Sequence, residues 1–73
     1  MNKLPVISGK DCVKALSKKG YYLRRQQGSH LILRRDIPFN QLVVPNHKVI
    51  DRGTLRAIIR QAELTVEEFN TLL

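Results

Sequence analysis

A glycine step separates two strand-like segments near the middle of the chain and limits how the chain can fold. Residues 21–26 and 29–35 are the strand-like segments, and Gln27 and Gly28 lie between them. Glycine adopts positive φ without steric cost, so this step suits the tight turn of an antiparallel hairpin. A chain of 73 residues buries only roughly 60% of its unfolded surface, so we expect a single domain, residues 1–73, with one thin core layer.

Capping signals predict a helix before the hairpin. Ser8 is followed three residues later by Asp11, in the form of a capping box, and apolar residues then recur at helical spacing. Gly20 supplies the left-handed residue that ends many helices. We therefore expect this helix over residues 9–19.

After the hairpin, the pattern predicts one more strand and two helices. Residues 36–40 form a turn or an irregular loop, and residues 41–44 form a short strand that ends at Pro45. A second helix begins at Thr54, and a capping box at Thr65 opens a short last helix. The order α-β-β-β-α-α predicts an α+β fold, with a three-stranded antiparallel sheet, helices on one face and the other face open to a ligand.

The two faces of the second strand differ in chemistry. Side chains alternate across a strand, and the leucines favour their own face as the core side. The opposite face then carries a histidine and an arginine, with an isoleucine as the apolar exception. The expected core side comprises Ser29, Leu31, Leu33 and Arg35, and the expected open side comprises His30, Ile32 and Arg34.

The charge is strongly positive and unevenly distributed. Thirteen Lys and Arg stand against six Asp and Glu, a formal net charge of +7, and all thirteen lie between Lys3 and Arg60. Three of the acids fall in the last eleven residues, so the preceding part carries thirteen basic and three acidic residues, or +10. Such a field attracts polyanions such as RNA. The alternative is a basic protein whose charge serves only solubility.

Several function classes receive no support from the sequence. Cys12 is the one cysteine, so the chain forms no internal disulfide and no cysteine zinc cluster. The carboxylates are scattered and no His/Asp cluster has metal-ligand spacing, so we expect neither a metal nor another cofactor. The sequence lacks a signal peptide over residues 1–7 and an apolar run of membrane-helix length, so we expect no membrane contact and a cytoplasmic protein.

His30 is the candidate for catalysis. An imidazole takes and gives protons near neutral pH, and RNA carries its own nucleophile in the 2′-hydroxyl beside each phosphate. Displayed on a basic surface, His30 could act in RNA phosphodiester cleavage. A structural role for a strand histidine is the alternative. The second proton-transfer group is open between His47, Lys48 and a water, although the loop position of His47 favours a structural or partner-contact role.

The candidate RNA-binding residues surround this histidine. Arginines on adjacent strands could pair with phosphates, and the absence of a side chain at the turn glycine lets an RNA backbone approach. Few aromatic side chains are available, so base readout by stacking is not expected. The set comprises Arg24, Arg25, Gly28, Ser29, Arg34, Arg35 and Lys48.

Five collinear stretches resemble the HicA family of small toxins. No single stretch is diagnostic, but their order along nearly the whole chain is specific. They are Leu4-Pro5-Val6-Ile7-Ser8-Gly9-Lys10, Gly20-Tyr21, Arg25-Gln26-Gln27-Gly28-Ser29-His30, Val44-Pro45-Asn46-His47-Lys48 and Gly53-Thr54-Leu55-Arg56-Ala57-Ile58-Ile59-Arg60-Gln61-Ala62.

The resemblance implies a fold similar to the double-stranded-RNA-binding domain, ribonuclease activity on messenger RNA and neutralisation by a HicB-type antitoxin. The family's catalytic histidine belongs to its Gly-Ser-His motif, which maps onto His30. The chain departs from the family in having Glu63 where glycine is frequent, and in a longer, more apolar loop at residues 36–40. Neither departure touches the Gly-Ser-His motif.

Three functions follow as hypotheses. The leading one is a metal-independent endoribonuclease toxin that cleaves mRNA with a single catalytic histidine, His30, and is inhibited by a HicB-type antitoxin in a hetero-oligomer. The second is a non-catalytic RNA-binding module that uses the same basic sheet face. The third is a protein-interaction domain for an acidic partner.

Overall fold

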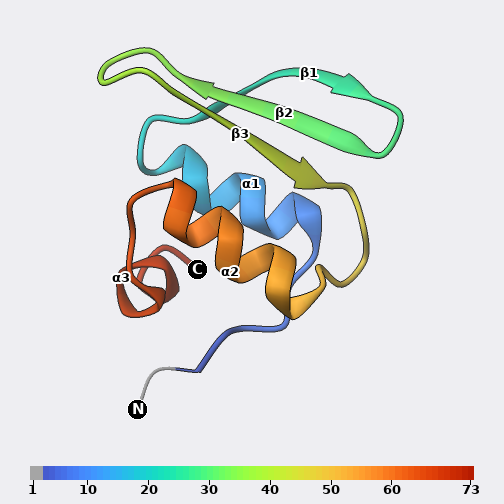
Figure 1. The fold of residues 1–73 in the computed structure, drawn as a ribbon, viewed down its shortest axis with the longest axis vertical. Coiled ribbons are helices and arrows are strands. Elements are labelled where there is room, and N and C mark those ends of the chain that lie inside the picture. Colours follow the sequence, from blue (N-terminus) through green and yellow to red (C-terminus); the bar gives the residue numbers. More distant parts are fainter. Residues whose placement is uncertain (1–2) are drawn as a thin grey trace.

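A three-stranded antiparallel sheet forms one layer of the molecule, and the helices lie against one of its faces (Figure 1). The computed structural model describes residues 3–73, so the first two residues of the predicted domain and of the segment searched for a signal peptide lie outside it. The sheet order is β1-β2-β3, and the predicted α+β order is confirmed. The elements are α1 Gly9–Ser17, β1 Tyr22–Gln27, β2 His30–Arg35, β3 Asn40–Pro45, α2 Arg52–Gln61 and α3 Val66–Asn70.

Several predicted boundaries shift by a few residues. Helix α1 ends at Ser17 rather than at residue 19, and Gly20 adopts φ +89° in the turn that follows. Strand β3 runs on through Pro45, which an edge strand tolerates because its outer N–H positions need no partner. Helix α2 begins at Arg52 rather than Thr54, because Asp51 is the N-cap that sequence reasoning missed.

The core lies between the inner face of the sheet and the helices. Leu31 and Leu33 of β2 are 5% and 0% exposed, which confirms the predicted core side for these two leucines. The prediction for Ser29 is wrong, because the turn consists of Gly28 and Ser29 and leaves Ser29 exposed before the strand begins. Fully burying one such side chain stabilises the fold by about 1.5–3 kcal/mol. Burial raises the pKa of the Cys12 thiol to about 12, so this side chain stays neutral and packs as a small apolar group. The remaining fully buried side chains are Leu16, Leu42, Val44, Leu55, Ile59 and Phe69.

A two-residue turn joins β1 to β2. Gly28 adopts φ +57° and is the first of the two turn residues, which is the arrangement of a type II′ hairpin. The Ser29 carbonyl accepts a hydrogen bond from Asn46 N at 2.6 Å, so the turn is also tied to the segment after β3. The pairing register shifts between Leu23 and Arg25, and Arg24 is the extra residue of this bulge.

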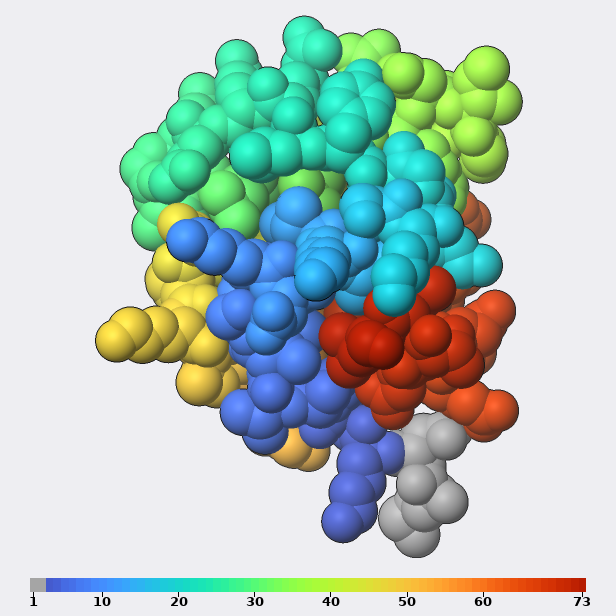
Figure 2. All heavy atoms as spheres, turned by 180° about the vertical axis from the view of Figure 1, so that it is seen from behind, coloured from blue at the N-terminus to red at the C-terminus, as the bar shows by residue number. Residues whose placement is uncertain are grey.

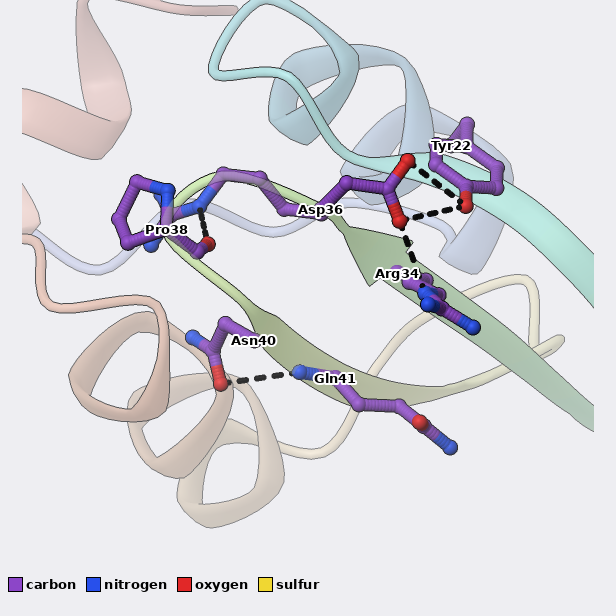
Figure 3. A network of polar contacts seen from close by, with 7 residues as sticks. Tyr22, Arg34, Asp36, Pro38, Asn40 and Gln41 are labelled. Atoms are coloured by element: carbon purple, nitrogen blue, oxygen red, sulfur yellow. Dashed lines mark hydrogen bonds and ion pairs between the residues drawn. The ribbon is translucent and has the colours of Figure 1, made fainter.

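The loop between β2 and β3 is held by polar contacts that Figure 3 shows from close by. Asp36 accepts hydrogen bonds from the Tyr22 hydroxyl at 3.1 Å and from Arg34 Nε at 2.9 Å. Asn40 donates to the Tyr21 hydroxyl at 2.7 Å and to the Gln61 carbonyl at 2.8 Å, which connects the start of β3 to the end of α2. Of the two predicted alternatives for residues 36–40, a turn or an irregular loop, the structure shows a turn with its own polar partners.

None of the helices formed by residues 3–73 has the length and apolar character needed to span a bilayer.

The start of α1 packs so tightly on the end of β3 that only glycine fits at position 9. A Cβ added to Gly9 would overlap the Pro45 carbonyl oxygen. We predict that Gly9→Ala lowers the free energy of unfolding by about 1–3 kcal/mol, as overpacking does. Gly53→Ala is the matched control, because a Cβ there would lie 3.3 Å from Asp51 Oδ2, a close contact with a side-chain atom instead of an overlap with backbone. Urea unfolding of both variants measures the effect, and equal stabilities would contradict it.

The cap of α3 should make stability depend on pH. The Thr65 backbone N–H donates to Glu68 at 2.9 Å and, with the Thr65 side chain, lowers the pKa of this carboxyl. A carboxyl whose pKa is lower in the folded state stabilises the fold above its unfolded pKa, and this contribution disappears as the pH falls through its folded pKa.

We therefore expect the wild type to melt at a higher temperature than Glu68→Gln near neutral pH, with the gap closing in acid. Glu67→Gln removes the same charge from the same turn without the cap contact and should show a smaller gap. Thermal melts across this pH range measure the effect, and a gap that stays constant in acid would show that the cap charge is not responsible.

Candidate functional site

His30 occupies the first position of β2, directly after the turn at Gly28 and Ser29. Its cross-strand partners are Gln27 on β1 and Pro45 on β3. Leu31 points into the core, so the alternation of the strand directs His30 to the open face, and its side chain is exposed. The predicted placement of His30 on the open face is confirmed.

A hollow of about 320 Å³ brings both histidines of the chain to one place. His30 and His47 line it together with the ends of neighbouring elements. The other lining residues are Val43, Pro45, Asp51 and Thr54. The sequence places His47 in a loop without indicating what it faces, and only the folded chain shows that the two imidazoles share this hollow.

Backbone hydrogen bonds fix the segment that carries His47. Asn46 N donates to Ser29 O at 2.6 Å, on the hairpin beside His30. Gly9 N donates to the His47 carbonyl at 2.9 Å, and Ile50 N donates to Ile7 O at the same distance. In Figure 2 the segment around residue 50 (yellow) lies beside the N-terminal part of the chain and α1 (blue). The loop therefore has a defined position against both the sheet and α1.

A second, adjacent hollow is basic. It measures about 250 Å³ and has His47 in common with the hollow that contains His30. Asn46 also lines it. Lys10 and Lys48 supply its charge, and Ser8 completes the lining. Lys48, which the sequence placed among the RNA-binding candidates, thus lies beside His47 and not in the hollow that holds His30.

The four candidate arginines lie in three different environments. Arg25 pairs with Ile32 on the open face, and Arg24 occupies the bulge. Within residues 3–73 no ion pair holds either of these two side chains. Their charges are therefore available to an anionic ligand.

Arg34 and Arg35 are neighbours with opposite orientations. Arg34 lies on the open face, bonds Asp36 at 2.9 Å and stacks over Phe39 at 5.2 Å from the ring centroid. Arg35 lies on the core side, stacks on Tyr21 at 4.7 Å and approaches Glu63 at 3.6 Å. Arg35 Nε also donates to the Pro38 carbonyl, so three groups of the protein already engage this guanidinium.

The open face also carries apolar side chains. Ile32 is buried although it points outward, between its cross-strand partners Arg25 and Val43. Val43 is 48% exposed, and Tyr22 and Phe39 are exposed toward the far end of the sheet. The face therefore combines arginines with aliphatic and aromatic side chains, a combination that suits the binding of nucleotides or of a protein partner.

Residues 3–73 contain no group of three or more His, Cys, Asp and Glu side chains placed to hold a metal ion. Asp51 is the carboxylate that lines the hollow shared by the two histidines. Its Oδ2 atom accepts hydrogen bonds from Gly53 N at 3.1 Å and Thr54 N at 3.3 Å, so it caps α2.

A comparison with models of known protein families identifies the family of this chain. The family model described as HicA toxin of bacterial toxin-antitoxin matches residues 9–64, which includes all three strands, α1 and α2. A search of curated proteins found no match. Because the family model covers most of the chain and the α-β-β-β-α-α order agrees with the resemblance seen in the sequence, the chain belongs to the HicA toxin family.

Proposed function

We propose that this protein is an endoribonuclease that cleaves messenger RNA through His30, without a metal, and that a HicB-type antitoxin inhibits it. The observation that carries the proposal is the exposed imidazole in a hollow on the open face of a basic sheet. Membership of the HicA toxin family supports a toxin role. mRNA and the antitoxin would both be met in the cytoplasm.

The chemistry needs little more than the groups present. His30 takes the proton of the 2′-hydroxyl, and the resulting oxygen attacks the adjacent phosphorus. A positioned imidazole contributes roughly 10²–10⁴-fold to such a proton transfer. Arg25 lies on the same face and has no ion pair within residues 3–73, so it stabilises the negative charge that grows on the phosphate oxygens.

The candidate residues divide by role under this proposal. Gly28 and Ser29 form the turn, where a small profile lets the RNA backbone approach His30. Further phosphate contacts come from Arg24 in the bulge of β1, Arg34 on the open face and Lys48 in the loop after β3. Arg35 faces the core and is engaged with Tyr21, Pro38 and Glu63, so we assign its main role to the fold.

The antitoxin would cover this same face. Residues 1–62 carry thirteen basic and three acidic residues, so a neutralising partner is complementary if it presents carboxylates around His30. The exposed apolar side chains of Val43 and Phe39 would then be buried against it. A complex in which His30 remains open to RNA would contradict this part of the proposal.

The first test replaces the imidazole. We predict that His30→Ala lowers the rate of RNA cleavage by about 10²–10⁴-fold, because the base is lost, and that cells expressing it keep growing. The melting temperature should change little, because the side chain is exposed. Gln27→Ala is the matched control, since Gln27 pairs directly with His30 on the neighbouring strand.

Gel analysis of a defined RNA with and without EDTA reads out this test. Wild-type rates for His30→Ala would contradict catalysis by this residue, and loss of wild-type cleavage in EDTA would contradict the metal-independent reaction. RNA binding by the wild type without any product would favour the non-catalytic RNA-binding module.

The second test measures phosphate contact at the open face. Each phosphate neutralised on single-stranded RNA contributes about 0.7 to the slope of log K against log salt. We predict that Arg25→Gln in a His30→Ala background reduces this slope by about 0.7. Arg60→Gln removes the same charge from exposed α2, in the helix layer, and should leave the slope unchanged. Fluorescence anisotropy at several salt concentrations checks this, and equal slopes for both variants would place the RNA elsewhere.

A further inference from the structure

The shared hollow contains a second imidazole that the proposed reaction has not used. His47 lines this hollow with His30, although the two residues come from different segments of the chain. The segment of His47 is tied to the hairpin through Asn46 N and Ser29 O at 2.6 Å, and to α1 through Gly9 N and the His47 carbonyl at 2.9 Å. The position of His47 relative to His30 is therefore built into the fold and does not depend on a mobile loop.

Cleavage by the 2′-hydroxyl requires two proton transfers at different oxygens. The attacking 2′-oxygen loses a proton, and the departing 5′-oxygen gains one. In phosphoryl transfer these two oxygens lie roughly in line on opposite sides of phosphorus. One imidazole beside the 2′-oxygen therefore cannot reach the 5′-oxygen in the same step. A hollow with an imidazole from each of two segments meets this requirement.

The other polar groups near His47 are less suited to the second transfer. Lys48 and Lys10 line the adjacent basic hollow and not the one that contains His30. Asp51 does line the shared hollow, but its carboxylate is held as the N-cap of α2 by Gly53 N and Thr54 N. Lys10, Lys48 and Asp51 are the charged residues that line the two hollows beside the histidines. Compared with these three, His47 is the proton donor that lines the hollow of His30 and does not cap a helix.

We propose that His47 is the general acid of the reaction, a proposal that rests on the ribonuclease activity proposed above. His30 accepts the 2′-hydroxyl proton as the bond from the 2′-oxygen to phosphorus forms. His47, as the imidazolium, gives its proton to the 5′-oxygen as the phosphorus–5′-oxygen bond breaks. The products are a 2′,3′-cyclic phosphate and a 5′-hydroxyl. His30 then holds one extra proton and His47 one fewer, and exchange with water restores both.

The basic hollow next to His47 offers binding groups for the RNA strand that carries the 5′-oxygen. The strand that leaves from the 5′-oxygen passes His47 and would continue toward Lys10 and Lys48, which can pair with its next phosphate. We therefore expect Lys48→Gln to raise KM and to leave kcat nearly unchanged, in contrast to a change at His47.

The test uses an RNA oligonucleotide whose scissile 5′-oxygen is replaced by sulfur, at the site that the wild type cleaves. A thiolate leaves without being protonated, so this substrate needs no general acid. We predict that His47→Ala and His47→Gln slow cleavage of ordinary RNA by about 10²-fold or more and cleave the sulfur substrate at close to the wild-type rate. His30→Ala should be slow on both substrates, because the base is still missing.

Each outcome separates the two proposals. Absence of RNA cleavage by the wild type would overturn both. Wild-type cleavage with a fully active His47→Ala would overturn only the role of His47, as would variants that stay slow on the sulfur substrate while melting at the wild-type temperature. His47→Gln keeps a polar side chain of similar size at an exposed position, so a folded variant is available for the comparison.

Discussion

The central strand β2 fixes both the core and the site, because its alternate side chains face opposite sides of the sheet. Leu31 and Leu33 are locked into the core against α1 and α2, and this burial determines where every other residue of the strand points. A slip of one residue would expose both leucines and bury His30, at a cost of about 1.5–3 kcal/mol for each side chain lost from the core. The orientation of the candidate catalytic residue is thus enforced by hydrophobic packing on the reverse side of the same strand.

The same alternation gives adjacent arginines different environments. Arg34 faces outward, held by Asp36 and Phe39 near the far end of the open face. Arg35 faces inward and bridges the sheet to the end of α2 through Tyr21 and Glu63. Glu63 also adopts φ +62°, a conformation that glycine accommodates more easily. Glu63 therefore combines this backbone conformation with an ion pair to the sheet.

Positive charge and apolar surface occur together on the open face, and each serves a different part of recognition. Arg24 and Arg25, which no ion pair holds within residues 3–73, would attract an anionic ligand from a distance and pair with its phosphates. Exposed Val43, Tyr22 and Phe39 offer contact area that a base or an antitoxin side chain can cover. Under the proposed function, RNA and the antitoxin would compete for this face, and contact with its apolar side chains would help to distinguish them because both ligands would carry negative charge.

Local φ preference and the period of apolar residues are sufficient to predict the order of elements, the hairpin at Gly28, the core face of β2 and the outward position of His30. The family resemblance is likewise readable from the amino-acid order. Helix ends are less predictable, because a cap such as Asp51 gives a weaker local signal. Long-range packing, in contrast, places His47 in one hollow with His30, Lys48 in the neighbouring one, and Arg35 against partners within the fold. These depend on contacts between segments distant in sequence, chiefly the docking of residues 46–50 onto the hairpin and α1, and no local pattern encodes such contacts.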